Sequence, residues 1–240
     1  MNLALDILGL DERTAKHFVN TILFRDDSLF DEIEIKSHAL KSNVLYCLDQ
    51  SVPVDDSNTI LRALKVLGIT GLQITLTKRI PIGGGMGGGS SNAGAVLRHF
   101  GNQNGIPEFQ LLEMAREIGA DVPFFVLDDN LAYAEGFGDQ IVQSWTIPPL
   151  DIEFVKTGVQ VSTARAYADL DMDQCGKGSA KTEALLTMLN SGKDALQCVS
   201  TNPGLFHNDF EHSFFKAHPE WKVKGRLSGS GGMLWKFRND

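Results

Sequence analysis

The 240-residue sequence predicts an α+β fold. The chain starts with apolar residues at alternate positions, Leu3, Leu5 and Ile7, which is typical of a strand with one face in the core. Residues 108–120 have the apolar spacing of an amphipathic helix. Strands and helices follow one another without regular strand–helix–strand alternation, and this order favours α+β layers over a doubly wound parallel sheet.

Capping signals delimit the first predicted helices. Ser57 or Asn58 can cap a helix over 59–68, and a helix over 92–101 follows a glycine-rich segment. Gly119 is placed to end the amphipathic helix. The other elements expected before residue 150 are strands at 18–24, 31–36, 73–80, 123–127 and 131–136.

The composition of the chain changes near residue 150, at the turn-rich segment TIPPLD. We therefore predict one domain over 1–150 and a second over 151–240. The second part is expected to contain a strand at 151–156, helices at 164–171, 181–190 and 207–217, and two strands around a glycine turn within 224–237.

Composition and charge exclude several classes of protein. The formal net charge of −8 argues against a broad nucleic-acid or anionic-membrane surface, although a local site can still be positive. The three cysteines, Cys47, Cys175 and Cys198, form neither a CxxC pair nor a zinc pattern. No apolar run approaches the roughly 18 residues of a membrane helix. We expect a cytoplasmic protein, a monomer or homodimer, with a small-molecule substrate and no membrane or nucleic-acid partner.

The segment PIGGGMGGGSSNAG at 81–94 has six glycines in seven positions. Gly83, Gly85 and Gly88 satisfy the dinucleotide-binding pattern GxGxxG. However, the acidic residue expected about 20 positions later, at the end of a second strand, is missing. A Walker loop needs a lysine after the glycines, and Ser90 follows instead.

A different kind of phosphate loop remains. Glycines let backbone N–H groups approach an anion closely, and a helix that begins near Ser90 presents free N–H groups and a positive dipole end. The hydroxyls of Ser90 and Ser91 can bind phosphate or Mg²⁺, and Lys78 and Arg79 add positive charge on the approach. The alternative is a flexible hairpin tip, which does not explain apolar Met86 between two glycine triplets.

The segment PIGGGMGGGSSNAGAVL resembles the phosphate loop of the GHMP kinases, which phosphorylate small molecules. The triple glycine after Met86, together with Asn92, resembles in particular the branch that acts on 4-diphosphocytidyl-2-C-methyl-D-erythritol. Further segments resemble this branch in order along nearly the whole chain: NLALDILGL, VPVDDSNTILRAL, GADVPFFV, AYAEGFGDQI, HNDFE and GRLSGSGGMLWKF.

The resemblance implies a two-lobed kinase with ATP and substrate in the cleft between the lobes. The nucleotide-binding lobe would be 1–150 and the C-terminal lobe 151–240. ATP and Mg²⁺ are the implied cofactors, with Ser90 as a metal ligand. A second glycine turn is expected near the phosphates, at Ser228, Gly229, Ser230 and Gly231. The implied ATP-binding residues are Asn58, Lys78, Pro81, Gly83, Gly84, Gly85, Met86, Gly87, Gly88, Gly89, Ser90, Ser91 and Asn92.

The resemblance also implies roles at the substrate. Asp121, in the segment GADVPFF, would be the base that deprotonates the acceptor hydroxyl, although an Asp before a strand can equally be a capping residue. The contacts implied for a cytidine diphosphate-linked alcohol are Asn2, His17, Tyr167 and Asp121. His17 can instead be an exposed loop histidine, and Tyr167 a core residue. Lys16 stands where the family has a stacking tyrosine, so one face of an aromatic sandwich is missing.

The chain departs from the family at both ends. The family's first strand is preceded by Pro-Ala-Lys, whereas this chain begins Met1-Asn2 without that lysine. The chain also stops at Asp240, soon after the second glycine turn. We therefore expect a sequence truncated at both ends, with reduced activity.

Three functions are compatible with these patterns. The first is ATP-dependent phosphorylation of the hydroxyl of 4-diphosphocytidyl-2-C-methyl-D-erythritol in non-mevalonate isoprenoid biosynthesis. The second is a GHMP kinase for another small alcohol, which the lysine at position 16 favours. The third is a nucleotide-binding homologue with impaired catalysis, which the missing N-terminal lysine favours.

Overall fold

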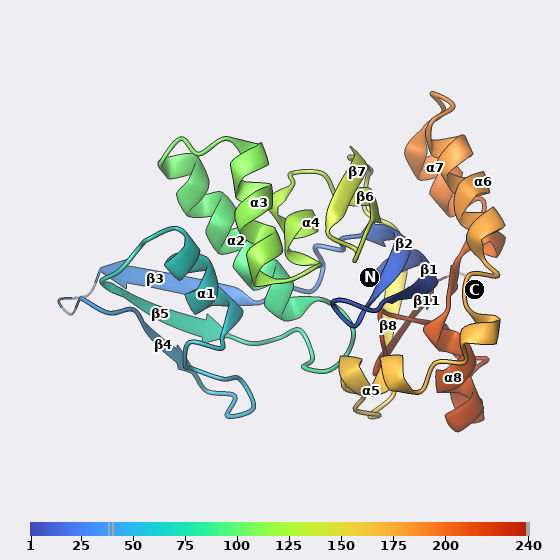
Figure 1. The fold of residues 1–240 in the computed structure, drawn as a ribbon, viewed down its shortest axis with the longest axis horizontal. Coiled ribbons are helices and arrows are strands. Elements are labelled where there is room, and N and C mark those ends of the chain that lie inside the picture. Colours follow the sequence, from blue (N-terminus) through green and yellow to red (C-terminus); the bar gives the residue numbers. More distant parts are fainter. Residues whose placement is uncertain (38, 40, 239–240) are drawn as a thin grey trace. The chain divides into compact units, whose positions relative to one another are not determined.

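The computed structural model describes residues 1–37, 39 and 41–238. Its contacts divide the chain into two compact units, each with its own core (Figure 1). Unit 1 contains residues 1–26, 83–86 and 129 onward, and unit 2 contains residues 27–82 and 87–128.

This division differs from the boundary predicted near residue 150. The first strand, β1 (Asn2–Asp11), pairs in parallel with β9 (His207–Asn208), so the start of the chain belongs with its last third. The change of composition near residue 150 lies inside unit 1 and separates no cores.

Unit 1 contains a five-stranded sheet in the order β7-β6-β2-β1-β9. β1 and β2 form an antiparallel hairpin, with Leu5 opposite Thr21, and β6 pairs antiparallel with both β2 and β7. The strands predicted at 18–24 and 131–136 are confirmed, whereas β7 was not predicted. The bounds are β2 (Lys16–Phe24), β6 (Leu131–Glu135) and β7 (Gln140–Trp145).

A three-stranded antiparallel sheet in the order β10-β11-β8 completes the strands described for unit 1. β10 and β11 are the two strands predicted around the second glycine turn. The helix expected from residue 207 begins at Phe210, because His207 and Asn208 pair with β1. The bounds are β8 (Ile152–Lys156), β10 (Arg226–Leu227), β11 (Met233–Phe237), α5 (Thr163–Ala168), α6 (Ser179–Leu189), α7 (Ala195–Ser200) and α8 (Phe210–Ala217), with 3-10 turns at Met172–Gln174, Pro203–Leu205 and Pro219–Trp221.

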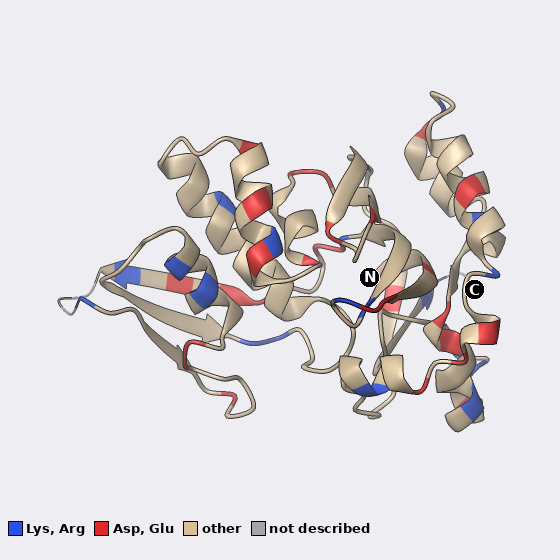
Figure 2. Cartoon of the chain, viewed as in Figure 1, with Lys and Arg blue, Asp and Glu red and all other residues tan. Residues whose placement is uncertain are grey.

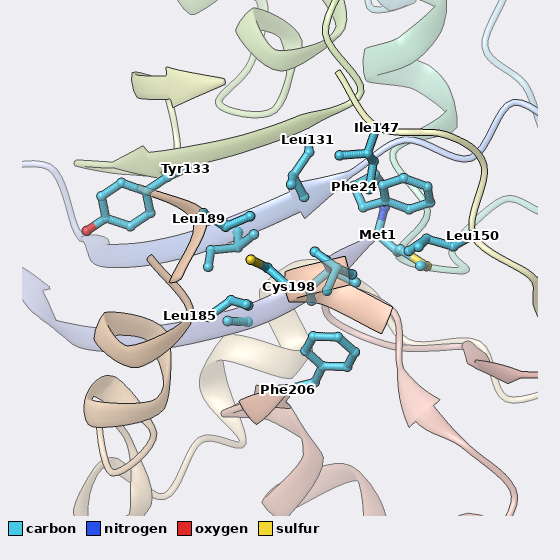
Figure 3. Close-up of a cluster of buried hydrophobic side chains, with 14 of the residues drawn as sticks. Met1, Phe24, Leu131, Tyr133, Ile147, Leu150, Leu185, Leu189, Cys198 and Phe206 are labelled. Carbon is cyan, nitrogen blue, oxygen red and sulfur yellow. The ribbon is translucent and has the colours of Figure 1, made fainter. Parts of the chain in front are cut away.

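The main core of unit 1 lies between its five-stranded sheet and the helices α6 and α7 (Figure 3). Phe24 and Leu131 from the strands pack with Leu185 from α6 and Cys198 from α7. Met1 joins this cluster, and its amino group donates to the Phe24 carbonyl oxygen at 2.8 Å. Each fully buried side chain of this size contributes about 1.5–3 kcal/mol.

Unit 2 packs the sheet β3-β5-β4 with α1, α2, α3 and α4 around one core. β3 runs antiparallel and β4 parallel to β5, and Ile74 of β5 is buried with Leu64 and Leu97 from the helices. Figure 2 shows charged residues of both signs along β3 and α3. The bounds are β3 (Glu32–Ser37), β4 (Val44–Cys47), β5 (Leu72–Thr77), α1 (Thr59–Val66), α2 (Gly88–Gln103), α3 (Glu108–Ile118) and α4 (Val122–Val126).

The strand predicted at 123–127 is wrong, because these residues form the short helix α4. Pro123 stands in its first turn, where a helix leaves N–H groups unpaired and the missing N–H of proline costs nothing. α4 packs tightly on α2, since a Cβ added at Gly94 would lie 2.5 Å from the Phe125 Cβ. A short apolar run in a sequence does not show whether the segment is a buried strand or a buried helix. Here the packing on α2 favours the helix.

None of the helices within the described ranges combines the length and apolarity needed to cross a bilayer.

Candidate active site

The first glycine segment and the second glycine turn meet through their backbones in unit 1. Gly85 has a φ of +68°, and a Cβ added there would lie 2.1 Å from the Ser228 carbonyl oxygen. Gly229 has a φ of +53°, and its Cβ would lie 2.4 Å from the Gly85 carbonyl oxygen. Both positions therefore require glycine for space as well as for φ. The structure brings together two segments that the sequence predicted separately.

Hydrogen bonds fix the second turn against the first segment. The Ser228 hydroxyl, which is buried, donates to the Gly85 carbonyl oxygen at 3.1 Å. The Ser228 N–H donates to the Met233 carbonyl oxygen at 2.9 Å, and the hydroxyls of Ser230 and Thr163 are 3.2 Å apart. The turn is thus tied to β11, to α5 and to the first glycine segment.

In unit 2, helix α2 begins at Gly88, two residues before the predicted start at Ser90. Its N-cap, Gly87, has a φ of 69° and offers no side-chain cap to the N–H groups of the first turn. A Cβ at Gly87 would lie 3.1 Å from the Phe125 ring, and one at Gly88 would lie 2.9 Å from Ile80 Cγ2. The close packing excludes side chains, and the helix end retains donors and a positive dipole end that suit an anion.

The two serines of this helix end differ in their surroundings. The Ser91 hydroxyl donates to the Gly88 carbonyl oxygen at 2.9 Å. In the described part of the chain the Ser90 hydroxyl has no hydrogen-bond partner. The same part contains no cluster of three or more His, Cys, Asp or Glu side chains that could hold a metal ion. A single hydroxyl fits Mg²⁺, which takes oxygen ligands and commonly completes its shell with water and phosphate oxygens.

Asp31 is a buried centre of this region that sequence reasoning missed. Its carboxylate lies 2.6 Å from the Lys78 ammonium group and 2.9 Å from the Asn92 amide nitrogen. It also accepts the N–H groups of Arg79 and Ile80, at 2.7 and 2.8 Å, so β5 ends at Thr77 rather than at residue 80 as predicted. Burial opposes ionisation of Asp31, but these hydrogen bonds outweigh it and lower the pKa of the carboxyl.

Three side chains predicted to bind ATP are occupied by other protein groups. The Lys78 ammonium group binds Asp31 and the Ile80 carbonyl oxygen, the latter at 2.8 Å. The Asn92 amide donates to Asp31, and Asn58 caps α1 by accepting the Ile60 N–H at 2.9 Å. These contacts hold the segments around the glycines in shape, and direct ATP contacts from these side chains stay a prediction.

Asp121, the predicted base, precedes α4 as its N-cap and makes no capping hydrogen bond with its side chain. The capping interpretation of its carboxylate is therefore not supported. The residue is exposed, yet protein atoms around the carboxyl displace enough water to raise its pKa. The role of Asp121 as a general base stays a prediction.

In unit 1, the predicted substrate residues His17 and Tyr167 stack on each other. Their ring centroids are 4.8 Å apart, with 17° between the ring planes. Tyr167 also meets Phe210 edge to face at 5.0 Å. Burial lowers the pKa of His17, which favours the neutral imidazole.

Asn2 and Lys16, the other residues considered for the substrate site, contact protein groups other than His17 and Tyr167. The Asn2 amide donates to the Thr21 hydroxyl at 2.7 Å within the sheet. The Lys16 ammonium group lies 5.4 Å from the centroid of the Phe137 ring, and Phe137 stacks on Phe18. Lys16 thus makes a cation–π contact in place of a stack beside His17.

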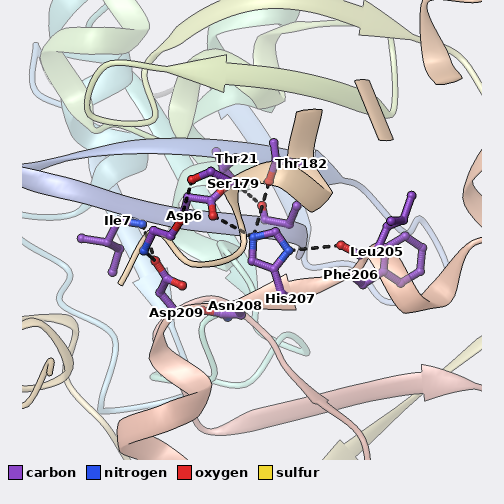
Figure 4. A network of polar contacts seen from close by, with 12 residues as sticks. Asp6, Ile7, Thr21, Ser179, Thr182, Leu205, Phe206, His207, Asn208 and Asp209 are labelled. Atoms are coloured by element: carbon purple, nitrogen blue, oxygen red, sulfur yellow. Dashed lines mark hydrogen bonds and ion pairs between the residues drawn. The ribbon is translucent and has the colours of Figure 1, made fainter. Parts of the chain in front are cut away.

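A buried polar network in unit 1 was also missed (Figure 4). His207 Nε2 lies 2.9 Å from Asp6 Oδ1, and the Thr182 hydroxyl donates to Asp6 Oδ2 at 2.5 Å. The Nδ1 atom of His207 lies 3.1 Å from the Leu205 carbonyl oxygen. Burial opposes the charged imidazole, but the hydrogen bonds to Asp6 and Leu205 outweigh it and raise the pKa of His207. The HNDFE segment was the only sequence signal that could have pointed here.

Comparison with known proteins decides the family. The sequence pattern of the GHMP kinases N terminal domain matches residues 58–129. The 4-diphosphocytidyl-2-C-methyl-D-erythritol kinase of Thermotoga maritima is 33% identical over 240 residues, covering 98% of this chain and 84% of the relative. The chain belongs to the GHMP kinase family. The enzyme of the same name from Thermotoga petrophila is 32% identical to this GHMP kinase with the same coverage.

Solved structures agree with this assignment. A crystal structure of 4-(cytidine 5'-diphospho)-2C-methyl-D-erythritol kinase has a TM-score of 0.71 and 29% identity, covering 98% of this chain and 85% of that one. Homoserine kinase from Cytophaga hutchinsonii shares the fold, with a TM-score of 0.59 and 20% identity, over 91% and 78% of the two chains. The predicted α+β GHMP kinase fold is confirmed, and the protein is a small-molecule kinase.

Proposed function

We propose that this GHMP kinase transfers the γ-phosphoryl group of ATP to a hydroxyl of 4-diphosphocytidyl-2-C-methyl-D-erythritol, in non-mevalonate isoprenoid synthesis in the cytoplasm. The observation that carries the proposal is its similarity, over nearly the whole chain, to relatives named for this substrate. The transfer breaks the bond from the γ-phosphorus to the bridging oxygen of ADP and forms a bond to the acceptor oxygen, whose proton passes to a base.

The phosphates of ATP are proposed to bind the glycine segments. In unit 1, Gly85 and Gly229 meet through their backbones without side chains. The absence of side chains supports a close approach of the backbone to a phosphate. In unit 2, the uncapped start of α2 supports anion binding, and the Ser90 hydroxyl is the proposed protein ligand of Mg²⁺. When bound, Mg²⁺ neutralises charge on the phosphates. Pro81, Met86 and the remaining loop glycines are proposed to shape the loop around the phosphates.

Asp121 is proposed to accept the proton of the acceptor hydroxyl. Its side chain is exposed, makes no capping bond and has a raised pKa, so it can hold a proton more readily than an ordinary aspartate. A base positioned in this way contributes about 10²–10⁴-fold to a rate.

Asn2, His17 and Tyr167 are proposed to contact the cytidine end of the substrate. A flat base would stack on the rings of His17 and Tyr167, and the neutral imidazole can donate or accept a hydrogen bond. The proposed partner of the enzyme is this small molecule, bound by a monomer or a homodimer.

One observation favours a second candidate, a GHMP kinase for a different small alcohol. A base inserted between His17 and Tyr167 needs about twice the ~3.5–4.0 Å contact distance of stacked carbon atoms. The two rings are 4.8 Å apart, so they must separate before a base can enter between them.

A substrate panel tests the proposal. Purified protein with Mg-ATP is supplied with 4-diphosphocytidyl-2-C-methyl-D-erythritol, homoserine or mevalonate, and the phosphorylated product is detected by mass spectrometry. We expect turnover of the cytidyl substrate above the others. Preferred turnover of another alcohol overturns the substrate assignment, and ATP binding without any transfer supports an impaired nucleotide-binding homologue.

A further inference from the structure

Three consecutive residues, His207, Asn208 and Asp209, connect β1 to the second glycine turn in unit 1. His207 binds Asp6 of β1 at 2.9 Å, and the Asp209 carboxylate accepts the N–H of Ile7 at 2.7 Å (Figure 4). The flanking side chains therefore clamp this segment to β1. Side chains along a strand point alternately to opposite sides, so the middle residue is free to bind a different element.

Asn208 uses its side chain to hold the second glycine turn. Its amide nitrogen donates to the Gly229 carbonyl oxygen at 2.8 Å and to the Leu227 carbonyl oxygen at 3.2 Å. Its amide oxygen accepts the N–H of Phe210 at 3.0 Å. The side chain is buried, with 5% of the residue exposed. Only an amide of this length supplies both the donors and the acceptor from one position.

The turn that Asn208 holds is the one that meets the first glycine segment. Gly229 lies against the Gly85 carbonyl, and the Ser228 hydroxyl donates to the same carbonyl oxygen. A shift of Gly229 by a few tenths of an ångström therefore changes the position of Gly85. Gly85 and Gly229 meet backbone to backbone, so no flexible side chain lies between them that could move to compensate for the shift.

We infer that Asn208 is a positioning residue for the phosphates of ATP. It fixes Gly229 against Gly85, and so sets the backbone geometry that the phosphates meet. The clamp of His207 and Asp209 on β1 gives Asn208 a rigid base from which to act. This inference rests on the proposed binding of ATP to the two glycine segments.

Two substitutions isolate the donor role of the amide. Asn208→Asp keeps the acceptor for Phe210 but replaces the amide donors by an oxygen that faces the Leu227 and Gly229 carbonyls. Asn208→Ala removes both functions. The matched control is Asn130→Ala, because Asn130 exchanges two 2.8 Å hydrogen bonds with Ile147 elsewhere in unit 1.

The Kd of ATP is measured by calorimetry, and the KM of ATP and of the acceptor by steady-state kinetics. Both are measured at a temperature where circular dichroism shows native helix content. The melting temperature is measured separately. We expect both Asn208 variants to raise the Kd and KM of ATP about tenfold, as the loss of one or two hydrogen bonds predicts, with the KM of the acceptor within about twofold of wild type. Asn130→Ala should lower the melting temperature and leave the Kd of ATP unchanged.

The outcomes separate this inference from the proposed function. If wild-type protein binds no ATP, the proposed function fails. If wild type binds ATP and folded Asn208→Asp binds it equally well, the positioning role is overturned while the proposed function stands. If Asn130→Ala weakens ATP as much as the Asn208 variants do, the effect reflects general loss of stability and the inference is also overturned.

Discussion

The ammonium group of Lys78 lies 2.6 Å from the carboxylate of Asp31, whose side chain is fully buried. The pair joins the end of β5 to the segment before β3, and Asn92 extends it into α2. The predicted contact of Lys78 with ATP stays a prediction, and its contacts in the structure support a role in holding unit 2 together.

We therefore expect Lys78→Met to lower the free energy of unfolding by about 3–5 kcal/mol, because it leaves a buried carboxylate without its cation. Urea denaturation measures this. Arg79→Met is the control, since its pair with Glu32 at 2.7 Å is exposed and should contribute only about 0–1 kcal/mol. The double variant Asp31→Asn with Lys78→Met should lose less than the sum of the single losses. A stable Lys78→Met protein with weakened ATP binding would instead identify Lys78 as a direct ligand.

Gly85→Ala should disrupt ATP binding and stability together. The new Cβ would lie 2.1 Å from the Ser228 carbonyl oxygen, at a φ of +68°. Gly68→Ala is a matched control, since Gly68 has a φ of +69° and nothing within 4 Å of the added Cβ. The control should lose only the roughly 1–2 kcal/mol of left-handed backbone strain and retain its ATP affinity. Equal behaviour of the two variants in calorimetry and thermal melts would contradict the close contact.

Asp121→Asn should lower kcat by about 10²–10⁴-fold while the Kd of ATP stays near the wild-type value. The substitution removes a base but keeps the size of the side chain. Asp128→Asn is the control, because that side chain is 96% exposed in the same unit. Turnover by Asp121→Asn close to wild type would remove Asp121 from the mechanism.

The Asp6–His207 pair predicts a pH-dependent stability. Both imidazole nitrogens of His207 face acceptors, the Asp6 carboxylate and the Leu205 carbonyl oxygen, which assigns the doubly protonated ring. Its pKa is raised in the folded state. The stabilisation is thus fully present below the unfolded pKa of about 6.5 and is lost as pH rises through the folded pKa.

The same region contains other groups that titrate. Asp209 and Glu211 also have raised pKa values, because burial disfavours their charged forms. The contribution of His207 is therefore measured as the difference in unfolding free energy between wild type and His207→Gln at each pH. We expect this difference in unfolding free energy to shrink as pH rises from about 6.5 through the raised folded pKa of His207. A difference that does not change with pH would contradict the charged pair.

The parts of the fold that could be predicted are those with a local signal. Asn58 before an amphipathic run and Gly119 after one fix the helices α1 and α3. The glycines of 83–89 indicate a close backbone approach, and the structure supplies its partner in Gly229.

The missed features depend on residues far apart in sequence. Asp31 lies in an acidic stretch without a pattern, and its importance comes from Lys78 and Asn92, which are 47 and 61 residues away. The apolar run at 123–127 has no periodicity that separates strand from helix, and packing against Gly94 decides it. Likewise, no local signal predicts that β1 pairs with a two-residue strand at His207.

The interrupted course of the chain has a consequence for folding during translation. All residues of unit 2 have been synthesised once residue 128 emerges from the ribosome. Unit 1 must wait for β9, and the segment around Gly85 must wait for Ser228 and Gly229. β1 can already pair with β2 in the nascent protein, but its other edge and the first glycine segment stay without β9, Ser228 and Gly229 until those residues have been synthesised.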